Sequence, residues 1–179
     1  MNQRLTNYLS LTRIHNPIGI GLLFLPCLFG IFLSLKQINL DLNQSLWFIF
    51  LFGFGSVIMR SAGCVINDIC DQKFDSQVHR TKNRPLAAKK ISRFEAWLLL
   101  FVLLLCGLLI LLQFNLATIL SGFFALILAA TYPLMKRVTY YPQIFLGFAF
   151  NFGILMSGFA ILGKINLSFI PKHHSPAHQ

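Results

Sequence analysis

The sequence predicts an all-α fold, a polytopic transmembrane bundle of about five helices, and two observations support this. Hydrophobic residues make up 56% of the 179 residues and charged residues only 11%, whereas an ordinary soluble domain has about a quarter charged residues. Five windows also approach the length of about 20 apolar residues that a membrane-spanning helix needs. The composition excludes a disordered chain, a disulfide scaffold and an ordinary soluble domain. A lipid bilayer is therefore the expected surrounding of the chain.

The five windows contain few charged residues. In order, they are Pro17 to Leu35, Leu46 to Ile66, Phe94 to Leu112, Leu116 to Met135 and Pro142 to Leu162. The third and fourth are separated only by Gln113, Phe114 and Asn115, which predicts a tight antiparallel hairpin. Ser92 and Glu95 have the Ser-x-x-Glu spacing of a capping box, so a helix is expected to begin beside them.

The positive charges predict the orientation in the membrane. If the helices alternate in direction, one side carries Arg4, Arg13, Lys73, Arg80, Lys82, Arg84, Lys89, Lys90, Arg93, Lys136 and Arg137. The other side carries Lys36, Lys164 and Lys172. The positive-inside rule then places the amino terminus and the long second loop in the cytoplasm. No aromatic-interleaved basic groove occurs despite the net charge of +10, so no nucleic-acid partner is expected.

Three of the five acidic residues of the chain lie close together, at the expected cytoplasmic end of the second helix. They are Asp68, Asp71 and Asp75. No Gly or Pro occurs in residues 64–84, so this helix is expected to continue out of the bilayer through all three. At 3.6 residues per turn, Asn67, Asp71 and Asp75 share one face, and Asp68 lies beside them.

Arg60 lies seven residues before Asn67 on the same helical stripe and is expected to face the bundle interior rather than lipid. The neighbouring carboxylates repel one another and resist joint ionisation unless a cation offsets the repulsion. Carboxylate and amide oxygens are hard ligands that favour Mg²⁺ or Ca²⁺. Because Mg²⁺ typically bridges carboxylates to phosphate oxygens, the cluster predicts a phosphorylated substrate.

The segment that follows the acidic cluster is basic. Arg80, Lys82 and Arg84 precede Pro85, and arginine can hold phosphate oxygens through two parallel donors. A metal on one side and arginine on the other would clamp a diphosphate. The alternative is that the acids form a solvated helix end and that the basic segment is only a topology signal.

These residues resemble those of a known family. Residues 67–75 read NDICDQKFD, which has the NDxxDxxxD form of the UbiA superfamily of intramembrane aromatic prenyltransferases. The surrounding segment RSAGCVINDICDQKFDSQVHRTKNRPL, residues 60–86, looks like the 4-hydroxybenzoate polyprenyltransferase branch. The likeness continues in YPLMKRVTYYPQIFLG, residues 132–147, and more weakly in TRIHNPIG, residues 12–19.

The resemblance implies a reaction, the Mg²⁺-dependent transfer of a polyprenyl group from polyprenyl diphosphate to the ring of 4-hydroxybenzoate in ubiquinone biosynthesis. It implies a bacterial or mitochondrial inner membrane as the location. A Lewis-acid metal stabilises the leaving diphosphate, and a dry bundle protects an allylic cation from water.

The resemblance also assigns roles to residues of this chain. It assigns catalysis to Asp68, Asp71 and Asp75, the metal to these three with Asn67, and substrate binding to Arg60, Arg80, Arg84, Lys136 and Arg137. Arg137 is the candidate partner of the acceptor carboxylate, and its alternative role is that of a positive-inside anchor.

The resemblance covers the amino-terminal part of the family pattern. Members have about nine helices and a second Asp-rich motif, whereas this sequence has no Asp after Asp75. Residues 1–163 are expected to form a partial prenyltransferase domain, and residues 164–179 a disordered polar tail. The chain is then active as it stands, completed by a second chain, or a truncated, non-catalytic remnant that at most binds Mg-polyprenyl diphosphate.

Two further interpretations differ in the acceptor or in the class of protein. Dihydroxynaphthoate and haem prenyltransferases share the donor, so only a comparison of acceptors separates them. A small transporter would spread ionisable residues through several helices, but here they cluster at one mouth.

Overall fold

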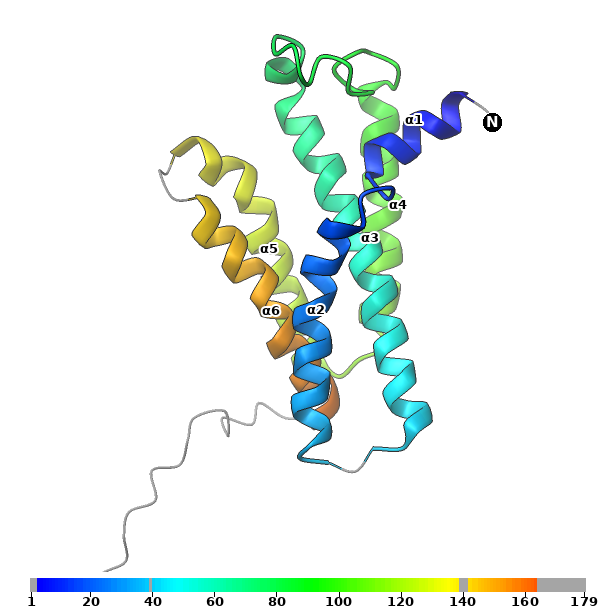
Figure 1. Ribbon diagram of the computed structural model, residues 1–179, viewed down its shortest axis with the longest axis vertical. Helices are drawn as coiled ribbons and strands as arrows, with labels where there is room; N and C mark the ends of the chain where they lie inside the picture. Colours follow the sequence, from blue (N-terminus) through cyan, green and yellow to red (C-terminus); the bar gives the residue numbers. More distant parts are fainter. Residues whose placement is uncertain (1–2, 39, 139–141, 164–179) are drawn as a thin grey trace, which may run out of the picture.

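The computed structural model describes residues 3–38, 40–138 and 142–163, and only the helical backbone of residues 132–138, 142–143 and 145–146. Within these ranges the chain forms six helices and no strand (Figure 1). They are α1 (Gln3–Thr12), α2 (Pro17–Leu35), α3 (Leu42–Asp75), α4 (Arg93–Leu111), α5 (Leu116–Val138) and α6 (Pro142–Leu162). The predicted all-α bundle is confirmed, and the short α1 is an addition to it.

In the part of the chain that the structure describes, three helices are long and apolar enough to cross a membrane, namely α2, α3 and α4. The described apolar parts of α5 and α6, Leu116–Thr131 and Gly147–Leu162, are shorter. The exposed apolar side chains of such helices need an apolar surrounding, and helical backbone hydrogen bonds allow the helices to enter it. The chain is therefore an integral membrane protein.

One core cluster joins α1, α3 and α4 at the end of the bundle that carries the acidic motif. Leu11 of α1 and Val65 of α3 are fully buried in it, and Leu86 and Ile91 of the α3–α4 loop pack against them. Burying an aliphatic side chain of this size stabilises a fold by about 2 kcal/mol. The loop between α3 and α4 is thus anchored by its own apolar residues, although it contains no regular element.

Helices α2 and α6 approach each other closely because small residues face each other. A Cβ on Gly30 would lie 2.1 Å from the Ser157 hydroxyl oxygen and 2.5 Å from the Ile154 carbonyl oxygen. A Cβ on Gly153 of α6 would lie 2.7 Å from the Cys27 sulfur. Contacts of this type are common between membrane helices, where packing of small side chains drives association.

The turn between α4 and α5 spans residues 112–115, one residue more than predicted, and the two helices do not form a tight hairpin. They diverge (Figure 1), and they touch near the turn, where Leu111 packs against Gly122. The reason lies in Asn115, whose side-chain amide donates to the Phe159 carbonyl of α6 at 2.7 Å while its oxygen accepts from the Thr118 backbone amide at 3.0 Å. Asn115 thereby caps α5 and draws it toward α6.

Candidate functional site

Helix α3 continues without interruption from the apolar region to Asp75, as predicted, and carries the acidic motif on its last two turns. Asp68, Asp71 and Asp75 are only 2%, 9% and 8% exposed. Carboxylates buried to this extent are destabilising unless they are paired or hydrogen-bonded. The alternative interpretation of the motif as a solvated helix end is therefore wrong.

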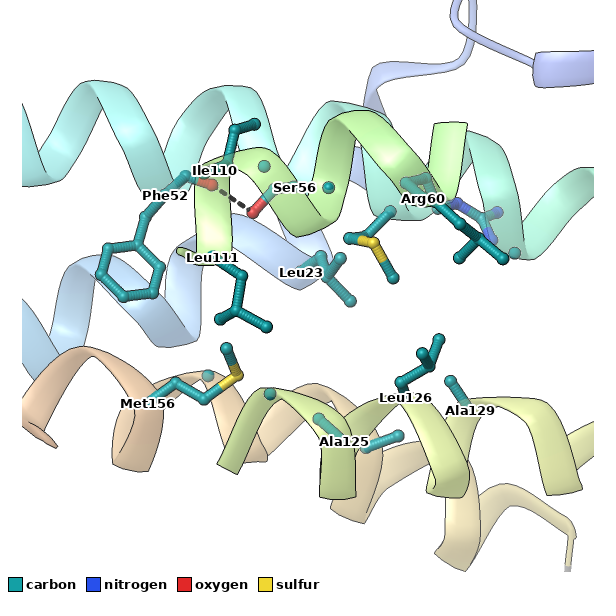
Figure 2. Close-up of a pocket in the computed structure, with 18 of the residues that line it drawn as sticks. Leu23, Phe52, Ser56, Arg60, Ile110, Leu111, Ala125, Leu126, Ala129 and Met156 are labelled. Atoms are coloured by element: carbon teal, nitrogen blue, oxygen red, sulfur yellow. Dashed lines mark hydrogen bonds between the residues drawn. The ribbon is translucent and has the colours of Figure 1, made fainter. Parts of the chain in front are cut away.

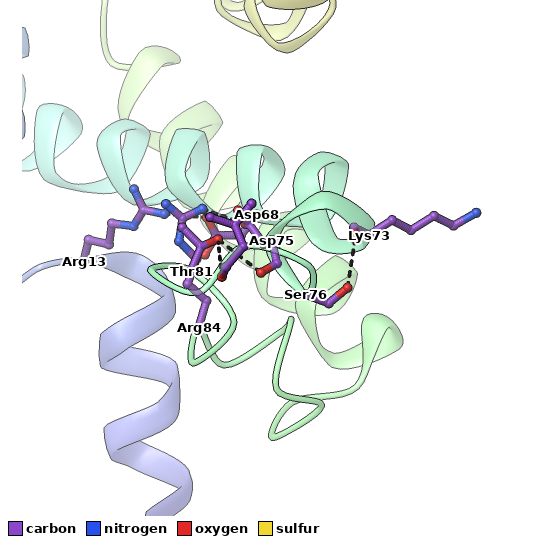
Figure 3. Close-up of polar contacts among 8 residues, drawn as sticks. Arg13, Asp68, Lys73, Asp75, Ser76, Thr81 and Arg84 are labelled. Carbon is purple, nitrogen blue, oxygen red and sulfur yellow. Dashed lines mark hydrogen bonds and ion pairs between the residues drawn. The ribbon is translucent and has the colours of Figure 1, made fainter.

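Two arginines hold two of these carboxylates (Figure 3). Arg13 contacts an Asp68 carboxylate oxygen at 2.5 Å, and Arg84 contacts the same oxygen at 3.4 Å. Arg84 also contacts Asp75 at 2.6 Å. Its guanidinium therefore bridges two carboxylates that lie about two helical turns apart on α3. Because Asp68 is buried, loss of either arginine would leave a charge without its full compensation.

The α3–α4 loop folds back over α3 and brings Arg84 to the motif. The Gln72 side-chain amide donates to the Leu86 carbonyl at 3.2 Å, and the Thr81 hydroxyl donates to the Asp75 carbonyl at 3.1 Å. Leu86, two residues after Arg84, is buried in the core. Arg84 of the basic segment therefore lies at the acidic face, in contact with Asp68 and Asp75.

Arg13 is a site residue that the sequence does not predict. It lies between α1 and α2 in the left-handed conformation, with φ of 53°, and its carbonyl accepts a hydrogen bond from the Asn16 amide at 2.9 Å. Non-glycine residues rarely adopt this conformation. The available signal is the presence of this arginine in the TRIHNPIG segment, but nothing in the spacing points to Asp68, which lies 55 residues away.

An apolar cavity of about 750 Å³ lies between α2, α3, α4, α5 and α6. Its walls include Leu23, Phe52, Leu111, Leu126 and Met156 (Figure 2). The divergence of α4 and α5 contributes to its width. The cavity has several times the volume of a single side chain and is lined mainly by apolar residues, which suits a large apolar ligand.

Polar side chains are concentrated at one end of this cavity. Arg13, Arg60 and Asn67 line it there. Arg60 points inward as expected and lies against α2 at Gly19, where an added Cβ would come within 2.2 Å of the Arg60 Nε. Gly19 therefore provides the space that the guanidinium occupies. The cavity thus has an arginine-lined mouth beside the acidic motif.

The side-chain oxygen of Asn67 is the one buried side-chain nitrogen or oxygen atom without a hydrogen-bond partner among the described residues. An unsatisfied buried acceptor is costly, so it calls for a ligand. It lies one turn before Asp71, and both supply hard oxygen donors of the type that Mg²⁺ prefers. No group of three or more Asp, Glu, His or Cys side chains in the described part of the chain forms a ready-made metal cage.

Of the remaining predicted residues, the structure describes the side chain of Arg80 alone. Arg80 is exposed, and none of its described contacts joins it to the three carboxylates. Lys136 and Arg137 lie in α5, but their side chains are outside the described residues, as is the whole segment 164–179 predicted as a tail.

A helical membrane bundle with a charged mouth beside an apolar cavity is the arrangement expected of a membrane protein that acts on an apolar ligand with an anionic head. A family model gives a more specific assignment. The model of the UbiA prenyltransferase family matches residues 23–172, and the chain belongs to that family. This finding confirms the resemblance predicted from the motif.

Curated relatives carry related names. The chain is 48% identical over 161 residues to a mitochondrial 4-hydroxybenzoate polyprenyltransferase of Drosophila pseudoobscura pseudoobscura, covering 90% of the chain and 40% of that relative. It is 44% identical over 161 residues to the human protein of that name, covering 90% and 43%. It is 43% identical over 165 residues to a 4-hydroxybenzoate octaprenyltransferase of Pseudomonas fluorescens, covering 92% and 54%.

The chain thus spans about half or less of the length of these relatives. No solved structure gives a significant match to it.

Proposed function

We propose that the chain takes part in Mg²⁺-dependent transfer of a polyprenyl group from polyprenyl diphosphate to the ring of 4-hydroxybenzoate, in ubiquinone biosynthesis. The observation that carries the proposal is the apolar cavity of about 750 Å³ with Arg13, Arg60 and Asn67 at one end, beside three buried aspartates. The polyprenyl tail of the donor requires an apolar region, and its diphosphate requires a charged region at one end of that region.

The chain's own residues bind and orient the donor. The isoprenoid tail lies along the apolar walls, and the diphosphate meets Arg60 and Arg84 at the mouth. Arginine suits this task because its planar donors match pairs of phosphate oxygens. The walls also exclude water from the carbon at which the allylic C–O bond breaks, so that the aromatic ring rather than water attacks it.

Asn67, Asp68, Asp71 and Asp75 would hold Mg²⁺. The orphaned buried oxygen of Asn67 and its spacing from the aspartates fit a hard cation of this kind. When bound, the metal supplies positive charge that stabilises the departing diphosphate. Arg84 already supplies positive charge to Asp68 and Asp75, and a cation with its diphosphate would share or replace that interaction.

The proposed acceptor is based on the names of the relatives, and the proposed orientation in the membrane is based on the distribution of positive charge. The names of the relatives specify 4-hydroxybenzoate, whose carboxylate would pair with Arg137 or Lys136 of α5. The positive-inside rule places the amino terminus and the motif on the cytoplasmic side of the membrane, or its mitochondrial equivalent. The diphosphate then approaches from the side on which the basic residues lie.

The test is prenyl transfer to labelled 4-hydroxybenzoate in membranes that contain this chain, with and without Mg²⁺, after immunoblotting confirms insertion. Product that requires Mg²⁺ and disappears in Asp71→Asn is the expected result. Parallel reactions with dihydroxynaphthoate examine the choice of acceptor.

Absence of product from well-inserted protein would overturn catalysis by this polypeptide alone. Donor binding that still requires Mg²⁺ would then favour a binding remnant, or a chain that needs a second polypeptide. Restoration of transfer by a co-expressed carboxy-terminal half of a relative would select the second of these explanations.

A further inference from the structure

A second, smaller cavity lies outside the site described above. It has a volume of about 240 Å³ and is formed by α1, the last part of the α3–α4 loop and the first turn of α4. It is lined by Arg4, Asn7, Tyr8, Lys89, Lys90, Ile91, Ser92 and Glu95. Three cationic residues from two segments about 85 positions apart in the sequence therefore line one small space.

The one carboxylate of this cavity is already engaged. Glu95 accepts hydrogen bonds from the Tyr8 hydroxyl at 3.1 Å and from the Ser92 backbone amide at 2.7 Å. Among the described residues, no carboxylate forms an ion pair with Arg4, Lys89 or Lys90. The cavity therefore retains an excess of positive charge, which favours an anion.

The backbone of the two lysines is held in a defined turn at the edge of this cavity. Lys89 adopts the left-handed conformation with φ of 56°. The amide of Lys90 donates to the Pro85 carbonyl at 2.8 Å, which closes the turn. Ile91 is buried in the core directly after the turn. The positions of the two lysines are therefore set by a folded loop rather than by a free tail.

The surroundings of the cavity place it at the membrane surface. Phe94 and Trp97, on the first turns of α4, are exposed, and exposed aromatic residues at the end of a membrane helix mark the level of the lipid head groups. Helix α1 lies at a steep angle to the bundle axis (Figure 1). Its Leu5 and Leu9 are exposed and lie one helical turn apart. They form an apolar stripe on α1 beside Arg4 and Tyr8, which line the cavity.

We propose that this cavity binds the phosphate head group of an anionic phospholipid. The three cations contact the phosphate, and the acyl chains lie along the exposed Leu5 and Leu9 of α1, which would lie in the interface. Basic pockets at this depth are typical sites for anionic lipid head groups. A free phosphate would use the same cations, but it would make no use of the apolar stripe beside them.

The test uses the whole chain in nanodiscs of phosphatidylcholine with increasing phosphatidylglycerol, and native mass spectrometry counts the lipid retained after transfer to detergent. The pocket variant combines Lys89→Asn, which tolerates the left-handed backbone, with Lys90→Gln. The matched control combines Lys73→Gln with Lys82→Gln, two exposed lysines that remove the same charge away from the cavity.

We expect preferential retention of phosphatidylglycerol to fall about 25-fold in the pocket variant, because each of the two lysines contributes about fivefold. In the control variant, we expect retention to fall less than twofold. Equal losses in the two variants would overturn the proposal, because charge alone would then explain retention. Arg4→Gln, from the other segment, should cost about fivefold; it provides an independent test if the double variant folds poorly by circular dichroism.

A second arm separates the two sources of phosphate. Inorganic phosphate is titrated against the wild-type chain, and thermal unfolding is followed. A phosphate-dependent stabilisation that Lys89→Asn removes, without any preference for anionic lipid, would overturn the lipid assignment in favour of a soluble anion. No substrate is present in either arm, so the outcome is independent of prenyl transfer.

Discussion

Gly19→Ala tests whether Arg60 serves the proposed donor site. The new Cβ would lie 2.2 Å from the Arg60 Nε and 2.8 Å from its Cζ and Nη2. Ordinary contact begins at 3.4 Å, so the guanidinium must move by about 1.2 Å. A displacement of this size exceeds the tolerance of a hydrogen bond to phosphate.

The expected effect follows from the strength of that bond. A hydrogen bond that involves charged groups contributes about 1.5–3 kcal/mol, which corresponds to about a 10- to 100-fold loss in affinity for the donor. The fold should not suffer, because Ala is favoured over Gly within a helix by up to about 1 kcal/mol and because the group that must move is the end of a flexible side chain.

The assay is equilibrium binding of an unreactive polyprenyl thiodiphosphate to purified protein in detergent with Mg²⁺. Gly21→Ala is the matched control, since it makes the same change two residues along α2, where nothing lies within 4 Å of the new Cβ. Wild-type affinity in both variants would refute the reasoning, because Arg60 would then make no contact with the diphosphate. Loss of affinity in both would implicate α2 itself.

Three further substitutions test the structure around the site. Arg84→Ala should destabilise the fold by about 1–3 kcal/mol in urea titrations, because two buried carboxylates lose a charged partner. Asn67→Ala should change the unfolding free energy without Mg²⁺ by less than about 0.5 kcal/mol, since the Asn67 side-chain oxygen has no hydrogen-bond partner among the described residues, and should weaken Mg²⁺ binding in calorimetry. Gly30→Ala should lower thermal stability by about 1–3 kcal/mol, because its Cβ would meet the Ile154 backbone of α6.

Each of these three substitutions has a control in which the same residue type is changed at another position. Arg80→Ala, at an exposed arginine, should leave stability nearly unchanged. Asn115→Ala should cost about 1–2 kcal/mol, because this amide caps α5 and donates to α6. Gly21→Ala serves again for α2. If members of a pair behave alike, the assignment of the contacts in that pair is wrong.

Local features of the fold are predictable from sequence. The bounds Pro17–Leu35 and Pro142–Leu162 match α2 and α6, since apolar windows that begin at a proline have clear limits. The capping box of Ser92 and Glu95 is present, with both reciprocal hydrogen bonds. The uninterrupted helix through Asp75 follows from the absence of Gly and Pro. These features depend on neighbouring residues alone.

A second set of features depends on contacts between distant residues and cannot be predicted in this way. Helix α1 is too short and polar for a membrane span, and it is held by Leu11 in the core. The short turn constrains the connection of α4 to α5 but not the angle between the two helices, which depends on the hydrogen bond from Asn115 to α6. Arg13 reaches Asp68 only because the backbone turns into the left-handed region.

The origin of the counter-ions of Asp68 has a consequence for biogenesis. One arginine precedes this aspartate by 55 residues, and the other follows it by 16. When α3 first leaves the ribosome, its acidic end has therefore received at most one of its two partners. The loop that carries Arg84 must be synthesised and folded back before the charges are balanced. Assembly of the mouth is thus a late step, which must follow translation of the segment between α3 and α4.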